Sequence, residues 1–141
     1  MDCTCSILQQ ARAAELSDDE FLRIFENRVV QTFYDGEEIF REGDEIDGIY
    51  CLHSGGVMLL KGDQAANGHV VDAIAAGELL GIANIFSGTH WTTTAQAAGT
   101  SLACFLPRQI FMMLVSHCPA LMLRAAEQAC RRLDRMEMAM G

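Results

Sequence analysis

The sequence predicts a mainly β domain, a closed sandwich or barrel of short strands with a helix before it and two helices after it. Three observations predict this fold class. Between residues 29 and 106, short runs rich in β-branched and aromatic residues alternate with glycine-containing turns. The segments on either side have the helical spacing of apolar residues. The chain has 141 residues, 50% hydrophobic and 21% charged, a composition typical of one folded domain and not of a disordered chain.

The first helix is expected to begin at Ser17. The run Ser17-Asp18-Asp19-Glu20 has the S-x-x-E pattern of a capping box, in which serine and glutamate side chains bond the first N–H groups of a helix. Its acidic residues also lie at the positive end of the helix dipole. The apolar face of this helix is expected to consist of Phe21, Leu22, Ile24 and Phe25. Residues 1–15 are expected to form a separate N-terminal arm.

A series of short strands is expected next, each bounded by a turn signal. The strands are expected at residues 29–34, 38–40, 49–53, 57–61, 69–74, 92–97 and 102–106. The turn signals between them include Asp35-Gly36, Gly43-Asp44, Gly55-Gly56 and Asn67-Gly68. The segments at 57–61 and 69–74 are expected to pair as a hairpin. Strands this short and this evenly spaced are typical of a closed β architecture.

Two helices are expected to complete the chain. Pro107 suits the start of a helix over residues 108–117, and a longer helix is expected from about residue 120 to the end. Along the longer helix a stripe of apolar residues recurs at alternating spacings of four and three, which is a heptad pattern. We expect this stripe to be a homodimer interface; the alternative is that the helix lies on its own barrel. The stripe consists of Met122, Ala126, Ala129, Leu133, Met136 and Met140.

The acidic balance of the chain bears on its partners and location. Asp and Glu number 19 against 10 Lys and Arg, a net charge of −9. Because nucleic acids attract clustered basic residues, this chain alone is expected to bind DNA weakly or not at all. No apolar run approaches the ~18 residues of a membrane span, and the first residues have no secretory signal pattern. We therefore expect a cytoplasmic protein without membrane contact.

Several glycine-containing segments, followed by an arginine-rich helix, resemble a known family. Residues 36–44, 49–57, 77–81 and 102–107 and the helix at 122–133 are similar, in this order, to the cyclic nucleotide-binding domain of Crp/Fnr transcription regulators. The resemblance implies a double-stranded β-helix, or jelly roll, and covers about residues 16–141. It implies an effector-sensing domain at 16–118 and a dimerisation helix at 119–141. The family reads DNA with a C-terminal helix-turn-helix, which we expect this chain to lack.

The family's phosphate cassette corresponds to residues 81–93, and here its chemistry is changed. Ile82 stands where the family has the glutamate that binds the ribose hydroxyl, and Trp91 where it has the phosphate-binding arginine. On the long helix, Met136 and Glu137 replace a Thr-Ser pair that touches the base. Losing charged contacts of this kind costs about 1.5–3 kcal/mol each, so no tight cyclic AMP binding is expected. The candidate ligand-binding residues are Gly81, Ile82, Ala83, Asn84, Trp91, Thr92, Thr93, Met136 and Glu137.

The apolar cassette favours a hydrophobic effector, an organic ligand or a haem that senses gas. Haem needs an axial ligand, and His90 beside Trp91 is the first candidate, although a surface histidine has the same pattern. An iron–sulfur cluster needs about four thiolates. Cys104 matches the barrel cysteine of Fnr-type oxygen sensors and Cys5 one N-terminal ligand, so the set is incomplete, and Cys104 is also explained as a buried hydrophobe. Trp91 either stacks on a ligand or packs in the core.

The function expected from these features is effector sensing. We expect a sensor domain of a Crp/Fnr-type regulator that signals by rearrangement of paired helices. The alternatives are a stand-alone dimeric module of the same fold, or an iron–sulfur or redox sensor. The four histidines include no H-x-H pair, and no triad order stands out, so no enzyme is expected.

Overall fold

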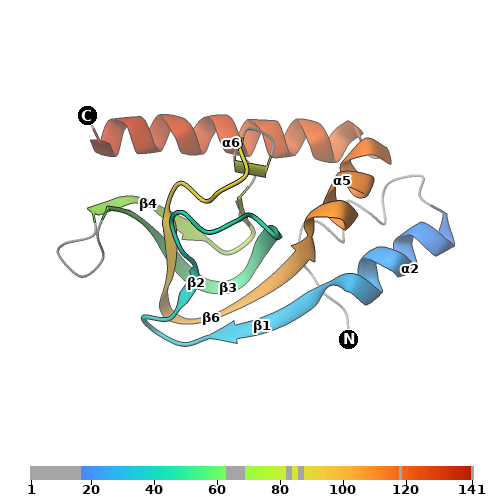
Figure 1. The fold of residues 1–141 in the computed structure, drawn as a ribbon, viewed down its shortest axis with the longest axis horizontal. Coiled ribbons are helices and arrows are strands. Elements are labelled where there is room, and N and C mark those ends of the chain that lie inside the picture. The colour runs from blue at the N-terminus through green and yellow to red at the C-terminus, as the bar shows by residue number, and fades with distance from the viewer. Residues whose placement is uncertain (1–16, 63–68, 82–83, 86–87, 118, 141) are drawn as a thin grey trace.

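The computed structural model describes residues 17–62, 69–81, 84–85, 88–117 and 119–140. Figure 1 shows a rolled sheet with one helix, α2 (Asp18–Asn27), before it, and two helices, α5 (Arg108–His117) and α6 (Pro119–Met140), after it. The expected fold class, a jelly roll with flanking helices and a long C-terminal helix, is confirmed. None of the described helices is long and apolar enough to cross a membrane.

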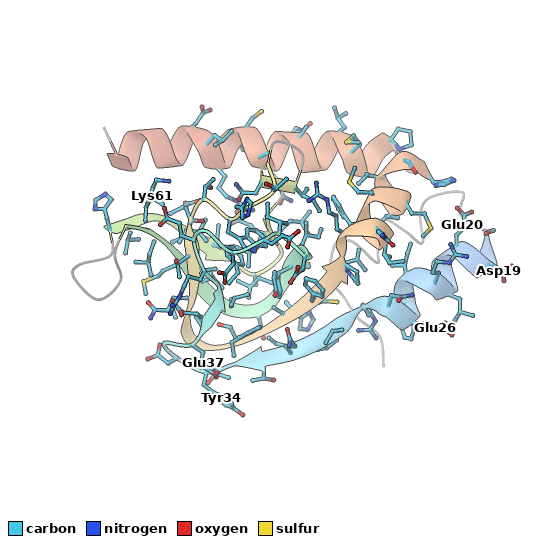
Figure 2. All side chains as sticks on the ribbon, viewed as in Figure 1. Asp19, Glu20, Glu26, Tyr34, Glu37 and Lys61 are labelled. Atoms are coloured by element: carbon cyan, nitrogen blue, oxygen red, sulfur yellow. The ribbon has the colours of Figure 1, made fainter. Side chains whose placement is uncertain are left out.

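The capping box at the start of α2 is formed as expected. The Glu20 N–H donates to Ser17 Oγ at 3.2 Å, and the Ser17 N–H donates to Glu20 Oε1 at the same distance. Ile24 from this helix is fully buried. Asp19 and Glu26 are exposed and extend outward from α2 (Figure 2), whereas the Glu20 carboxylate lies 3.3 Å from His117 Nε2 of α5.

The strands form one antiparallel sheet in the order β1-β6-β3-β4, with β2 paired to β6 and β5 paired to β3. The predicted hairpin is confirmed, because Val57 of β3 pairs with Ile74 of β4. The strand bounds are β1 (Val29–Phe33), β2 (Glu38–Phe40), β3 (Gly48–Lys61), β4 (His69–Ala75), β5 (Leu79–Leu80) and β6 (Thr94–Pro107).

Two of the predicted strand boundaries are wrong. The break expected at Gly55-Gly56 and the gap expected between 97 and 102 lie inside continuous 14-residue strands, β3 and β6. The register shifts twice between Leu52 and Gly56, so β3 bends and continues. Gly55 has a φ of +88°, and a Cβ there would lie 2.4 Å from Ser101 Oγ, so a glycine makes this bend possible. The short strand β5 was not expected.

The core fills the inside of the roll, and the helices close it. Fully buried residues come from the strands, from α2 and from α5; they include Ile24, Ile49, Leu52, Leu80, Phe111 and Leu114. Helix α2 contacts α5, and α6 lies along β4 (Figure 1). The long C-terminal helix is thus in contact with its own roll over part of its length.

Candidate functional site

The cassette begins where β5 ends. Gly81 follows β5 with a φ of +98°, and the Ile85 N–H donates to the Gly81 carbonyl at 2.9 Å, which forms a short helical turn. Arg108 at the start of α5 donates to the Ile85 carbonyl at 3.2 Å and so ties this turn to α5. Ile82 and Ala83 lie outside the described residues.

Trp91 fills the space beside Gly81. Its side chain is only 4% exposed and stacks on Phe40, with ring centroids 3.6 Å apart and planes 10° from parallel. A Cβ at Gly81 would lie 2.6 Å from Cη2 of the indole, so the ring rests on the bare α-carbon of the glycine. The Trp91 N–H donates to the Asp44 carbonyl, and the Gly43 N–H donates to the Trp91 carbonyl, at 2.9 and 2.8 Å. The indole is therefore fixed in the core by both its backbone and its ring.

An aromatic cluster continues from Trp91 into the roll. Phe40 lies between Trp91 and Tyr50, and the Phe40 and Tyr50 centroids are 6.0 Å apart. Burial raises the pKa of Tyr50, and the negative charge of Asp47 raises it further. The phenol therefore remains neutral, and this side of the site is uncharged and aromatic.

Polar groups lie at the rim of the cassette. Asn84 Nδ2 donates to Thr92 Oγ1 at 2.9 Å, and Lys61 Nζ donates to the Thr92 carbonyl at 3.0 Å. Lys61 Nζ also lies 3.9 Å from Glu42 Oε2, so its charge is already balanced. Thr93 is buried. Lys61 (labelled in Figure 2) was not predicted as a site residue, because only the register of β3 on β6 brings it to this rim.

Two side chains of α6 contact the turn that leads into the cassette. Gln128 Oε1 accepts a hydrogen bond from the Leu79 N–H at 3.2 Å, and Arg132 Nη2 lies 3.6 Å from Glu78 Oε2. Arg132 is 7% exposed. Neither contact was expected, because the sequence pattern does not predict which face of α6 packs against the roll. The side chains of Met136 and Glu137, the expected helix contribution, lie outside the described residues.

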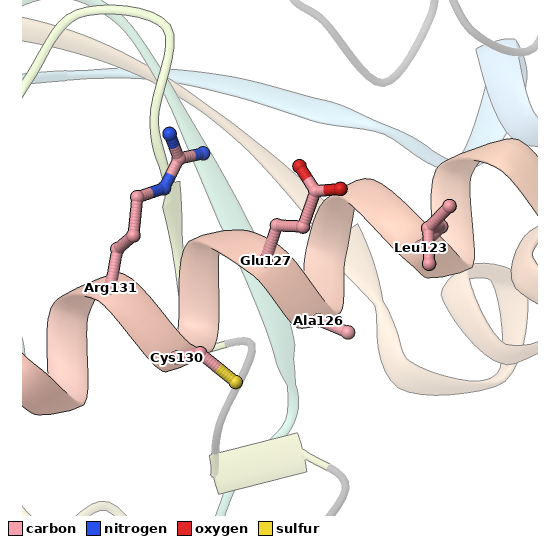
Figure 3. Close-up of a pocket in the computed structure, with 5 residues that line it drawn as sticks. All are labelled: Leu123, Ala126, Glu127, Cys130 and Arg131. Carbon is pink, nitrogen blue, oxygen red and sulfur yellow. The ribbon is translucent and has the colours of Figure 1, made fainter.

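The expected dimer stripe lies partly on the outer side of α6. Met122, Ala126 and Leu133 are exposed, whereas Ala129 is half-buried and packs against the core. The side chains of Met136 and Met140 lie outside the described residues. Beside the stripe is a shallow groove (Figure 3), lined by Leu123, Ala126, Glu127, Cys130 and Arg131. The homodimer remains a prediction.

Two of the three candidate metal ligands, His90 and Cys104, lie in the described part of the chain. His90 is exposed, with Nδ1 2.8 Å from Thr89 Oγ1. Cys104 is buried in the core on β6, and Cys5 lies outside the described residues. Among the residues that the structure describes, no three His, Cys, Asp or Glu side chains come together in a way that could hold a metal ion.

Comparison with known proteins establishes the family. The profile of the cyclic nucleotide-binding domain matches residues 30–118 of this chain, which is more than half of it. The chain belongs to the cyclic nucleotide-binding domain family. The Crp/Fnr resemblance inferred from the sequence is confirmed at the level of family and fold.

Similar proteins include bacterial regulators and a kinase subunit. The chain is 28% identical over 120 residues to the fumarate and nitrate reduction regulatory protein of Vibrio cholerae, with 83% of this chain and 47% of that protein covered, so it spans about half the length of that relative. The catabolite activator protein of Thermus thermophilus has a TM-score of 0.70 at 21% identity, over 96% of this chain and 62% of the other. A regulatory subunit of a cAMP-independent protein kinase A from Trypanosoma brucei, in a triple mutant bound to cAMP in the A site, has a TM-score of 0.68 at 17% identity, over 94% and 53%.

Proposed function

We propose that this chain is the effector-sensing domain of a Crp/Fnr-type transcription regulator, and that it does not bind cyclic AMP tightly. The observation that carries this proposal is the position of Trp91, buried between Phe40 and Gly81. A cyclic phosphate at the start of the cassette would compete with the indole for space. It would also lose its water shell against an uncharged ring, at a cost of several kcal/mol for an uncompensated charge.

The rim of the cassette offers little compensation to a phosphate. Lys61 is the cation that the described residues bring to Thr92, and Glu42 lies 3.9 Å from its Nζ. An incoming anion would therefore also face the negative charge of Glu42. A lysine is also a point charge that lacks the planar fork with which an arginine binds phosphate.

The kinase subunit from Trypanosoma brucei gives a useful parallel. It is described as cAMP-independent, and the mutant that holds cAMP in its A site carries a Thr-to-Arg substitution among its three changes. That protein therefore has this fold without depending on cyclic AMP. We take the Trp91 side chain of this chain to have a comparable effect.

An apolar effector fits the site better than a nucleotide does. Trp91, Phe40, Ile85 and neutral Tyr50 all belong to the core or pack against it, so a ligand that displaced the indole would meet hydrocarbon and aromatic groups. Apolar pockets with few polar groups favour hydrophobic ligands. Haem is one such ligand; His90 would be its axial ligand through Nε2, while Nδ1 would keep its contact with Thr89.

The signal would pass from the cassette to α6. Gln128 and Arg132 bind the Glu78-Leu79 turn, which leads directly into Gly81. The same helix exposes Met122, Ala126 and Leu133 for pairing with a second copy. An effector that moves this turn would therefore change the position of the pairing face. We place DNA binding outside this acidic chain, in a regulator of which it is the sensor.

Trp91 is the single tryptophan of the chain, so its fluorescence reports on the site itself. The test is an anaerobic titration with haemin and, in parallel, with N-phenyl-1-naphthylamine, an uncharged apolar probe. We expect saturable quenching of Trp91 by one of the two at one molecule per chain, and a Soret band that His90→Ala removes if haem is the effector. A Trp91→Phe variant provides the blank. If neither ligand changes the emission, an apolar effector at this site is excluded.

A further inference from the structure

Two cysteines that are far apart in the sequence face each other inside the roll. Cys51 on β3 is the direct antiparallel partner of Cys104 on β6. Their exposures are 0% and 5%, both belong to the core, and both carry thiols. Direct cross-strand partners project from the same face of a sheet, so the two sulfur atoms are neighbours.

The spacing of paired strands suits a disulfide at this position. Direct partners in an antiparallel ladder have Cα atoms about 4.5–5.5 Å apart, and disulfides span Cα separations of about 4.4–6.8 Å. The Cβ separation, about 4.5–5.5 Å in such a pair, needs to close by about 1 Å. A bond between Cys51 and Cys104 therefore requires only a small adjustment of β3 and β6.

We propose that Cys51 and Cys104 form a modification site, a thiol pair that hydrogen peroxide converts to an intrachain disulfide. One sulfur attacks a peroxide oxygen, the O–O bond breaks, and a sulfenic acid and one water form. The second sulfur then attacks the sulfenic sulfur, the S–S bond forms, the S–O bond breaks and a second water leaves. Two thiols are oxidised by two electrons in all, and one peroxide is reduced to two waters. Because both cysteines are buried, the oxidant has to be small and uncharged.

The pair lies close to the strand that α6 contacts, so its oxidation would act on the position of α6. Cys51 also pairs with Leu79 of β5. The Leu79 N–H donates to Gln128 of α6. Drawing β3 toward β6 at Cys51 thus acts on the strand that the C-terminal helix contacts. The inference depends on the strand register alone and holds whether or not the proposed effector is correct.

Peptide mapping of the whole chain tests the proposal. The reduced protein is treated with hydrogen peroxide, alkylated after denaturation and digested with trypsin without reductant. Trypsin cleaves after Arg41, Lys61 and Arg108, so the two cysteines fall in separate peptides, 42–61 and 62–108. We expect these two peptides to appear joined, two hydrogens lighter than their sum, and to separate on reduction.

Three variants make the mapping specific. Cys51→Ala and Cys104→Ala should each abolish the joined peptides, whereas Cys130→Ser should retain them, because Cys130 is exposed on α6. If either alanine variant does not fold, the wild-type map alone decides. Recovery of both peptides with alkylated thiols after peroxide treatment overturns the proposal, and so does a link from either cysteine to a different one.

Discussion

The indole of Trp91 stacks face to face on the phenyl ring of Phe40, with centroids 3.6 Å apart. The Cη2 and Cζ3 atoms of the same indole lie against Gly81, the first residue of the cassette. This arrangement places an uncharged aromatic side chain where the resemblance implies an arginine. The effect of a larger side chain at residue 81 should therefore depend on the side chain at residue 91, and mutations should reveal this dependence.

Gly81→Ala should destabilise the protein more than Gly77→Ala. Both glycines have a positive φ, +98° and +94°, so alanine meets similar backbone strain at each, about 1–2 kcal/mol. A Cβ at Gly77 meets nothing within 4 Å, whereas one at Gly81 meets Trp91. Overlap in a packed core adds about 1–3 kcal/mol. Urea unfolding of the two variants measures the difference.

The link to Trp91 is isolated by repeating that comparison in a Trp91→Ala background. There the difference between the two alanine variants should nearly vanish, because the overlapping ring is gone. Trp91→Ala alone should cost about 3–5 kcal/mol, as for other buried aromatic residues, while Tyr34→Ala, at an aromatic residue that is 63% exposed, should cost far less. Equal losses at Gly77 and Gly81 would rule out the close contact.

The contact between Arg132 and Glu78 should stabilise the docking of α6 on the roll. In a double-mutant cycle of Arg132→Met and Glu78→Gln, we expect a coupling of about 1–3 kcal/mol, because Arg132 is 7% exposed and its charge is poorly screened. The exposed pair Arg41 and Glu38 is the matched control, with an expected coupling below about 0.5 kcal/mol. Similar couplings for the two pairs would contradict a special role for Arg132.

The capping box predicts how stability depends on pH. Hydrogen bonds from the Ser17 backbone and then from its side chain lower the pKa of Glu20. A group whose pKa is lower in the folded state stabilises it above the unfolded pKa of about 4.5, and that contribution is lost as pH falls through the folded pKa. Glu20→Gln should therefore reduce the acid-dependent loss of stability below about pH 5.

The control for the capping box is Glu26→Gln, in the same helix but outside the box. Chemical denaturation at a series of pH values between about 3 and 7 compares the two variants with the unchanged protein. If Glu20→Gln leaves the slope of stability against pH as it was, the capping box makes no pH-dependent contribution.

The outer face of α6 should join two copies of the chain. Leu133 is 48% exposed in one copy, so Leu133→Glu should change the stability of the single fold by less than about 0.5 kcal/mol. The same substitution places a charge in the expected interface and should convert a dimer to a monomer in sedimentation velocity. Glu127→Gln, which neutralises a charge on the same helix, should leave the assembly intact. A dimer that survives Leu133→Glu would place the interface elsewhere.

Local patterns in the sequence predicted the features that depend on nearby residues. The capping box of Ser17 and Glu20 and the hairpin of β3 with β4 involve short stretches of chain, and both were predictable. The continuity of β3 was not predictable, because Gly55 bends the strand against Ser101 of a different strand. A glycine that allows a bend has the same local signature as one that ends a strand.

Some features of the candidate site were also predictable from the sequence, and others depend on the tertiary structure. The resemblance located the cassette and the unusual residue Trp91, but not the stacking of that residue on Phe40, which follows from the pairing of β2 with β6. Lys61 and Arg132 reach the site only through strand register and helix rotation. Contacts of this kind join segments that are far apart in the sequence, and no local pattern predicts that they are close in space.

The most direct test of the account is calorimetric titration of the whole chain with cyclic AMP. The Trypanosoma brucei mutant that holds cAMP in its A site is the positive control. With Trp91 occupying the cassette, the account predicts no saturable binding at micromolar nucleotide in this chain. A dissociation constant in the micromolar range or below would contradict it, because it would mean that the indole leaves the site and that the phosphate finds partners there.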